Sequence, residues 1–298
     1  MKKTALCCLL LMLLFSCEKD FNPSLESGAD KMVINSLFND NGKIVVYITK
    51  SYALSGSNNV TPVTGANVNL YQDGIFAEQL PWVPSDSVNS YGSYQSSLVP
   101  QKGHTYSISV SHPAYGTATA TDSIPMPAQI ITAKMLQYGT AGGGKVVVDF
   151  NIKDNPALLN FYRINIWLGG NQISVDDRGD TTYAPYYEAR GPDMLSPVED
   201  TVRDGIFLLF SDKGFNGQAK ELKMQFDNLD TAQFSNLQVW VELHTVSQTE
   251  FEYQQGLALY RGLSGASYGE PVNVYSNINN GYGIFMAEQF QSVGFPVK

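Results

Sequence analysis

The chain has 298 residues, of which 43% are hydrophobic, and this is enough to form one or two hydrophobic cores. Its formal charge of −9 argues against a protein that binds nucleic acid or anionic membranes through a basic surface. All three cysteines lie within the first 17 residues, so the rest of the chain has no disulfide, no thiolate metal site and no cysteine nucleophile.

The first 16 residues have the features of a signal peptide. Lys2 and Lys3 precede the apolar run 6–15, which is too short to span a bilayer, since that needs about 20 residues. The run ends at Leu14-Phe15-Ser16-Cys17, which resembles the lipobox of bacterial lipoproteins. The resemblance implies that residues 1–16 are cleaved off and that Cys17 is acylated. Without the two lysines, 17 of the 19 basic residues remain against 28 acidic ones, a charge of −11, so the lipid would provide the anchor.

Residues 17–30 are mostly polar and are predicted to form a lipidated tether. The acidic residues directly after Cys17 resemble the export signal of surface lipoproteins in Bacteroidetes-type bacteria. The resemblance implies the outer membrane, and it favours the cell surface over the periplasmic face.

From residue 31 onward, apolar and polar residues alternate along many short segments, which predicts strands of antiparallel sheets. Clear examples are 66–70, 106–110, 222–226 and 237–243, and turn signals such as Asp73-Gly74 separate the segments. This pattern predicts an all-β fold with two β-sandwich domains. Pro125-Met126-Pro127 is the expected joint, so the domains are predicted to cover 31–125 and 126–298.

Two parts of the chain resemble known families. The segments 64–71, 92–94 and 103–108 contain GA-x-V, G-x-Y and G-x-x-Y patterns, as in transthyretin-like and carboxypeptidase-regulatory sandwiches. The ending 270–285, with N-I-x-x-G-x-G-I-F, resembles a large family of Bacteroidetes-type lipoproteins known only as a domain of unknown function. Members are often encoded beside TonB-dependent outer-membrane receptors, which implies such a receptor as a partner. The ending itself predicts a strand, a glycine-rich turn and a last apolar strand.

One segment has helical periodicity. Ser247 and Glu250 form a capping box, with Ser247 as the N-cap residue, and Tyr253, Leu257 and Tyr260 follow at helical spacing. This predicts a single helix from about 248 to 261.

Motifs that would indicate an enzyme are present only in part. The G-x-S-x-G at 265–269 has no histidine downstream, and the P-loop-like stretch 139–145 is followed by a strand pattern instead of a helix. The three histidines, His104, His112 and His244, are too scattered for a transition-metal site and are predicted to be solvated. The acidic stretch 176–180 predicts an exposed turn, with calcium binding as the alternative. We therefore expect no enzyme, no cofactor and no metal.

Two tryptophans are the candidate binding residues. Trp82 lies between Pro81 and Pro84, and Trp240 lies on the polar face of its strand, so both are predicted to be partly exposed. Such side chains stack on sugars or pack against a partner protein. The expected function is that of a lipid-anchored accessory protein that binds a ligand of unknown identity beside a TonB-dependent transporter. The alternative is a structural or adhesion lipoprotein of the cell surface.

Overall fold

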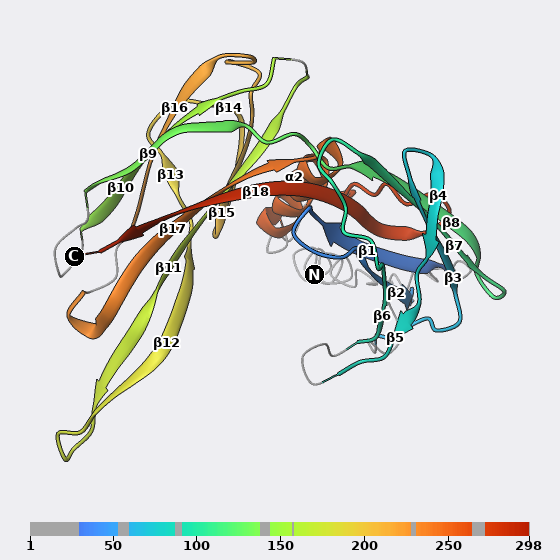
Figure 1. Cartoon of the computed structure of the whole chain (residues 1–298), viewed down its shortest axis with the longest axis horizontal. Helices are drawn as coiled ribbons and strands as arrows, with labels where there is room; N and C mark the ends of the chain where they lie inside the picture. The colour runs from blue at the N-terminus through green and yellow to red at the C-terminus, as the bar shows by residue number, and fades with distance from the viewer. Residues whose placement is uncertain are drawn as a thin grey trace, which may run out of the picture. The chain divides into compact units, whose positions relative to one another are not determined.

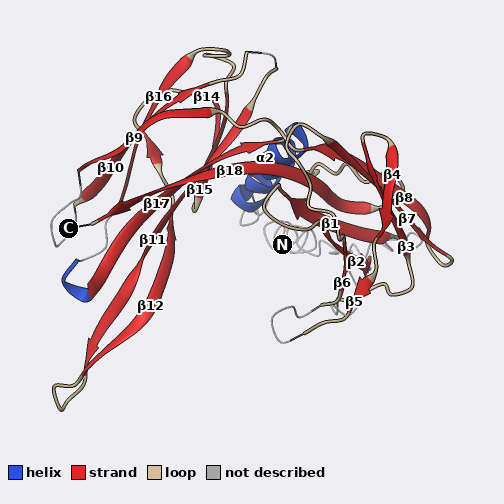
Figure 2. Ribbon diagram, in the orientation of Figure 1, coloured by secondary structure: helices blue, strands red, loops and turns tan. Residues whose placement is uncertain are grey.

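The computed structural model describes residues 30–52, 60–86, 91–137, 144–156, 158–227, 231–263 and 272–297. Within these ranges the chain is all-β with one α-helix, as the alternation predicted (Figures 1 and 2). No helix among the described residues is long and apolar enough to cross a membrane.

Residues 30–124 form most of a first sandwich. Alternate residues are buried along 32–38 and 105–110, because successive side chains point to opposite faces of the sheet. Asp73 and Gly74 both have positive φ, 50° and 80°, the conformation of a tight hairpin turn, as their sequence predicted. The strands are β1 (Met32–Phe38), β2 (Val45–Lys50), β3 (Asn67–Gln72), β4 (Ile75–Gln79), β5 (Trp82–Val83), β6 (Ser93–Gln95), β7 (Thr105–His112) and β8 (Gly116–Ser123).

The later strands form a second sandwich. One of its layers has the order β13-β16-β10-β9, and the other contains β11, β12, β14, β15 and β17. The strands are β9 (Gln129–Gln137), β10 (Lys145–Lys153), β11 (Phe161–Val175), β12 (Thr181–Arg190), β13 (Asp193–Met194), β14 (Glu199–Asp204), β15 (Phe207–Ser211), β16 (Ala219–Asp227) and β17 (Phe234–Val246). A 3-10 turn, η1 (Thr231–Gln233), precedes β17.

The last strand, β18 (Tyr282–Pro296), belongs to both sandwiches. Its first part pairs in parallel with β1, and its remainder, from Glu288 onward, pairs antiparallel with β17. The two sandwiches therefore share one ten-stranded sheet of order β14-β15-β11-β17-β18-β1-β2-β6-β5, with β12 beside β11. Ile124 belongs to the first core and Ala128 to the second, on either side of the predicted joint. Phe285, from the segment expected to form the second domain, also packs in the first core.

Hydrogen bonds of Asn277 and the conformation of Gly283 explain two of the residues in the N-I-x-x-G-x-G-I-F ending. The side-chain amide of Asn277 donates to the carbonyl oxygens of Phe285 at 2.7 Å and Thr121 at 3.1 Å, and its oxygen accepts the Phe285 N–H at 3.0 Å. Gly283 has φ 100°, and a Cβ there would lie 2.1 Å from the carbonyl oxygen of Ile34, so only glycine fits beside β1. The prediction of a strand before this turn was wrong. Residues 272–281 contain only an isolated bridge between Asn279 and Thr119, because side-chain bonds replace ladder pairing.

The predicted helix is present as α2 (Gln248–Leu263). Half of the predicted capping box is confirmed, since the Glu250 N–H donates to Ser247 Oγ at 3.1 Å. The reciprocal bond is missing. The Ser247 N–H donates instead to the carbonyl oxygen of Ala287 at 3.0 Å, and the carboxylate of Glu250 turns to Arg163.

Candidate functional site

The sheet face opposite the second core carries polar and aromatic side chains. On β11 the even-numbered Ile164, Ile166 and Leu168 point into the core, so the odd-numbered residues point the other way. Because directly paired residues of antiparallel strands share a face, the register places neighbouring residues of β17, β18 and β12 on this outer face as well. The outer-face residues used below are Arg163, Trp167 and Gly169 of β11, Trp240, Glu242 and His244 of β17, Glu288, Ser292 and Gly294 of β18, and Tyr187 of β12.

Helix α2 covers one end of this face. Phe251 of α2 packs on Phe161 with ring centroids 4.5 Å apart, inside a small apolar cluster with Val246. The helix also contacts β14, where Arg261 pairs with Asp204. Whatever the outer face carries at this end is therefore removed from water.

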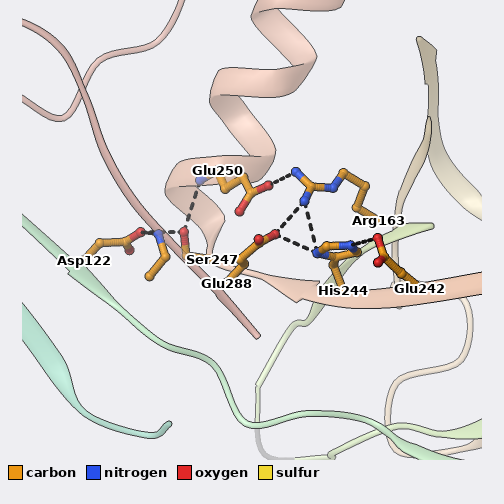
Figure 3. Close-up of polar contacts among 8 residues, drawn as sticks. Asp122, Arg163, Glu242, His244, Ser247, Glu250 and Glu288 are labelled. Carbon is orange, nitrogen blue, oxygen red and sulfur yellow. Dashed lines mark hydrogen bonds and ion pairs between the residues drawn. The ribbon is translucent and has the colours of Figure 1, made fainter. Parts of the chain in front are cut away.

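Beneath the helix lies a buried ion cluster, defined as Arg163, His244, Glu250 and Glu288 (Figure 3). The guanidinium of Arg163 bonds Glu250 through Nη1, and through Nη2 it bonds Glu288 at 2.5 Å. His244 Nδ1 lies 2.7 Å from Glu288 Oε2 and 3.0 Å from Arg163 Nη2. All four side chains are at least nine-tenths buried. The prediction that His244 is solvated was wrong, since its strand face is polar but α2 covers it.

The surroundings separate the pKa values of the two carboxyl groups. Burial raises the pKa of Glu250 to about 8, although Arg163 opposes the effect. Burial acts the same way on Glu288, but the His244 hydrogen bond and the Arg163 charge outweigh it and lower the pKa of Glu288. For His244, burial alone would lower the pKa, and its bonds to Glu242 and Glu288 raise it above the usual value. At neutral pH the cluster therefore keeps Glu288 ionised and a proton on Glu250.

A second buried group joins α2 to the first sandwich. Asp122 of β8 accepts hydrogen bonds through Oδ2 from the Ser247 hydroxyl at 2.6 Å and the Ala287 N–H at 2.7 Å. Burial raises the pKa of Asp122 to about 6, against these hydrogen bonds. The N-cap residue of α2 is thus bonded to strands β8 and β18.

The other end of the face is not covered by α2 and contains an aromatic pocket of about 440 Å³, lined by Trp167, Tyr187, Trp240, Glu242 and Ser292. Trp167 and Trp240 are directly paired across β11 and β17. Tyr187 is 70% exposed, and its ring centroid lies 6.0 Å from that of Trp240, with the planes tilted by only 34°. These two rings form an aromatic surface.

Two glycines allow the Trp240 indole to lie against the sheet. A Cβ on Gly169 would lie 2.5 Å from Trp240 and 2.7 Å from Tyr187, so any larger residue would displace both rings. A Cβ on Gly294, the direct partner of Trp240 on β18, would lie 3.1 Å from the indole. The absence of side chains at these positions is what makes room for the pocket.

Glu242 connects the pocket to the buried ion cluster. Its Oε2 accepts the Trp167 indole N–H at 2.8 Å and lies 3.4 Å from His244 Nε2 (Figure 3 shows the His244 contact). The His244 bond lowers the pKa of Glu242 against its partial burial, so this carboxylate is ionised at neutral pH. Its side chain is 23% exposed and reaches the pocket. The pocket therefore has an aromatic surface with a hydrogen-bond acceptor at one side.

The two candidate tryptophans have different environments. Trp240 forms part of the aromatic pocket. Trp82 packs against the first core, and its ring centroid lies 5.1 Å from that of Tyr94. Its indole lies directly against Gly92, where a Cβ would be only 2.2 Å from the indole. Both are half-buried, as predicted, but the structure gives only Trp240 aromatic neighbours in a pocket.

The candidate sites that fall within the described residues provide no metal-ligand geometry. Asp176 uses its carboxylate to close its own turn, accepting the N–H groups of Arg178 and Asp180 at 2.9 and 2.8 Å. In the described part of the chain, no group of three or more His, Cys, Asp or Glu could hold a metal ion. His104 pairs with Asp73 at 2.6 Å. Cys17 and the motif at 265–269 lie outside the described residues, as does most of the stretch 139–145.

Sequence reasoning missed Trp167, Tyr187 and the buried partners of His244. The period-two signal was present in Arg163-Ile164-Asn165-Ile166-Trp167-Leu168, which places Arg163 and Trp167 on one face. Strand pairing was needed to bring that face beside Trp240 and Glu242, and it is not readable from the sequence.

Comparisons with known proteins identify a family. The family model described as "Domain of unknown function (DUF4249)" matches residues 18–292. No curated protein matches the sequence. Among solved structures, the Yersinia pseudotuberculosis adhesin InvE is similar at 14% identity, with a TM-score of 0.19, over 72% of this chain and 55% of that chain, so this chain spans about half of it. A structure of Gaeumannomyces graminis manganese lipoxygenase with part of Komagataella pastoris zonadhesin is 13% identical, with a TM-score of 0.20, over 73% of this chain and 89% of that one. Both TM-scores are too low to relate the folds. The match over residues 18–292 shows that the chain belongs to the DUF4249 family, a domain of unknown function.

Proposed function

We propose that this protein is a lipid-anchored binding protein of the outer membrane, without catalytic activity, that captures a ligand and works beside a TonB-dependent transporter. The observation that carries the proposal is the aromatic pocket of Trp167, Tyr187 and Trp240, which α2 leaves uncovered. Small-molecule sites are typically concave and mostly apolar, with a few placed polar groups. The pocket has this composition.

The chemistry of the pocket favours binding over hydrolysis. Glycoside hydrolysis needs two convergent carboxyl groups, and Glu242 is the one acidic residue among those that line the pocket. The nearest further acid in its network, Glu288, is buried and bonded to Arg163 and His244. Among the described residues that line the pocket, no second carboxyl group accompanies Glu242.

The anchor is part of the same proposal. Support comes from the lipobox-like Leu14-Phe15-Ser16-Cys17 and from the polar tether that follows it. We also propose that the protein is a lipoprotein of the Bacteroidetes type and that its first sandwich is transthyretin-like. It would lie at the cell surface or at the periplasmic face of the outer membrane. The transporter as partner rests on the resemblance of the chain's ending to that lipoprotein family.

To test the anchor, the tagged full-length protein is expressed in its native host, and the membranes are separated from the soluble proteins. Cys17→Ala should move the protein to the soluble fraction and abolish acyl labelling, while the matched control Cys7→Ala, in the apolar run of the signal peptide, should stay in the membrane. Membrane retention of Cys17→Ala would contradict the anchor.

The same membranes test the partner. Detergent extracts of the wild type should contain a copurifying TonB-dependent transporter, and extracts of Cys17→Ala should contain much less of it. If the anchored wild type recovers no transporter, the accessory function is wrong. The structural or adhesion lipoprotein then becomes the better proposal.

A further inference from the structure

Resting on the proposed function, we infer that the aromatic pocket binds a pyranose ring of a neutral oligosaccharide, which stacks its C–H face on Trp240 and Tyr187 and donates a hydroxyl hydrogen bond to Glu242. Three properties of the pocket lead to this ligand class. They are its aromatic surface, its placed hydrogen-bonding groups and its charge balance.

The partly exposed aromatic surface fits a ring that has an apolar face. Trp240 and Tyr187 are tilted by 34°, and Gly169 and Gly294 let the indole lie against the sheet. A cage for a compact cation would instead need aromatic walls that surround it. A pyranose presents C–H groups on its face and hydroxyls around its edge, so it can cover the rings and still reach polar groups beside them.

Two polar groups stand beside the rings. Glu242 and Ser292 are direct partners across β17 and β18, so their side chains lie side by side on the outer face next to Trp240 and Gly294. The Glu242 side chain is 23% exposed, and a purely apolar ligand would remove the water that reaches it without replacing its hydrogen bonds, which is costly. A polyhydroxylated ligand would satisfy it.

Charge balance favours a neutral ligand. Glu242 is bonded to His244, and His244 lies beside Arg163 and Glu288. The two carboxylates of Glu242 and Glu288 therefore face two basic groups, the Arg163 guanidinium and the His244 imidazole, whose pKa is raised. The basic groups of the buried ion cluster therefore offset the negative charge of Glu242. Toward a ligand, the Glu242 carboxylate serves as a hydrogen-bond acceptor more than as a counter-ion. Anions are disfavoured by the formal charge of −9.

The size of the pocket favours a small ligand over a protein surface. Its volume of about 440 Å³ lies in the range of ligand pockets, about 300–1,000 Å³, and five residues line it. A stable protein interface buries about 800 Å² on each partner and involves roughly 20 or more residues.

The test is calorimetric titration of the folded protein with five neutral hexasaccharides: cellohexaose, laminarihexaose, maltohexaose, mannohexaose and xylohexaose. We expect at least one to bind with a Kd of about 1 mM or tighter. Trp240→Ala and Tyr187→Ala should each weaken that binding at least about tenfold, because each removes a stacking ring. Tyr187 is 70% exposed, so its variant should keep the wild-type melting temperature and remain interpretable if Trp240→Ala fails to fold.

Two further variants sharpen the test. Gly169→Ala keeps every aromatic ring but should also weaken binding, since its methyl group would displace Trp240 and Tyr187. Tyr260→Ala removes a tyrosine of α2 that is 53% exposed and lies outside the pocket, and it should bind like the wild type.

The proposal is overturned if none of the five sugars binds at about 10 mM, or if binding is unchanged in both Tyr187→Ala and Trp240→Ala. Binding of choline without binding of any sugar would also overturn it, in favour of a cation site. The outcome is separable from the proposed function. Recovery of the transporter without sugar binding would leave the accessory role standing and refute only the ligand class.

Discussion

Replacing Arg163 by methionine tests the reasoning about the buried ion cluster. The substitution keeps most of the side-chain volume and removes the charge that faces Glu250 and Glu288. The side chains of Arg163, Glu250 and Glu288 are 8%, 0% and 5% exposed, so solvent screens their interactions very little. Removing one partner of such a buried pair typically costs about 3–5 kcal/mol. We expect Arg163→Met to lower the free energy of unfolding by this amount near neutral pH.

The magnitude should depend on pH. In the wild type the pKa of Glu288 is lowered, so its stabilisation is present above its unfolded pKa and is lost only as the pH falls below that value. Without Arg163, Glu288 keeps its hydrogen bond to His244 but loses the second group that lowers its pKa, so the pKa of Glu288 in the folded state rises. Each unit of that rise costs about 1.36 kcal/mol once the pH exceeds the new pKa, so the loss should be larger at pH 8 than at pH 5.5. Burial already raises the pKa of Glu250 to about 8, so its contribution largely cancels in the comparison.

The assay is urea unfolding of both proteins at the two pH values, with Arg203→Met as the matched control. Arg203 is 53% exposed and pairs with Asp193 at the surface, where an ion pair contributes about 0–1 kcal/mol. A loss for Arg163→Met that is as small as that of the control, or that is equal at both pH values, would refute the proposed charge state of the cluster.

Burial raises the pKa of Asp122 to about 6, so between about pH 4 and 6 the folded wild type keeps a proton that the unfolded chain has lost. Because the folded state binds more protons there, the contribution of Asp122 to stability falls as the pH rises through this window. Asp122→Asn cannot titrate, so unfolding curves should show its stability rising relative to the wild type by about 3 kcal/mol across that window; a constant difference would contradict this. Trp82→Ala should lower stability by about 2 kcal/mol or more in the same assay, since the indole closes over Gly92 and packs on Tyr94, and an unchanged midpoint would mean that the ring is not part of the packing. The protein from residue 18 onward has no cysteine, so its melting temperature should be the same with and without reductant, and a shift of several degrees would show that a thiol-dependent link had been overlooked.

Local sequence patterns were sufficient for the elements that depend on neighbours in the chain. Alternation along 237–243 predicted a strand of β17, and Asp73-Gly74 predicted the turn between β3 and β4, because side-chain direction and turn conformation are properties of a few consecutive residues. Ser247 marked the start of α2 because an N-cap acts on the next three residues. The same alternation correctly placed Trp240, Glu242 and His244 on the polar face of their strand.

Tertiary structure decided what that face does. Whether a polar face meets water or another element depends on packing between segments far apart in the chain, and no local pattern reports it. Helix α2 covers His244 and turns it into a buried charge partner of Glu288, while Trp240, four residues earlier, stays accessible beside Trp167 and Tyr187. Strand β18 is another case. Its sequence predicts a strand, but only the pairing with β1 at one end and β17 at the other makes it part of both sandwiches, because register between distant strands is set by the cores that they enclose.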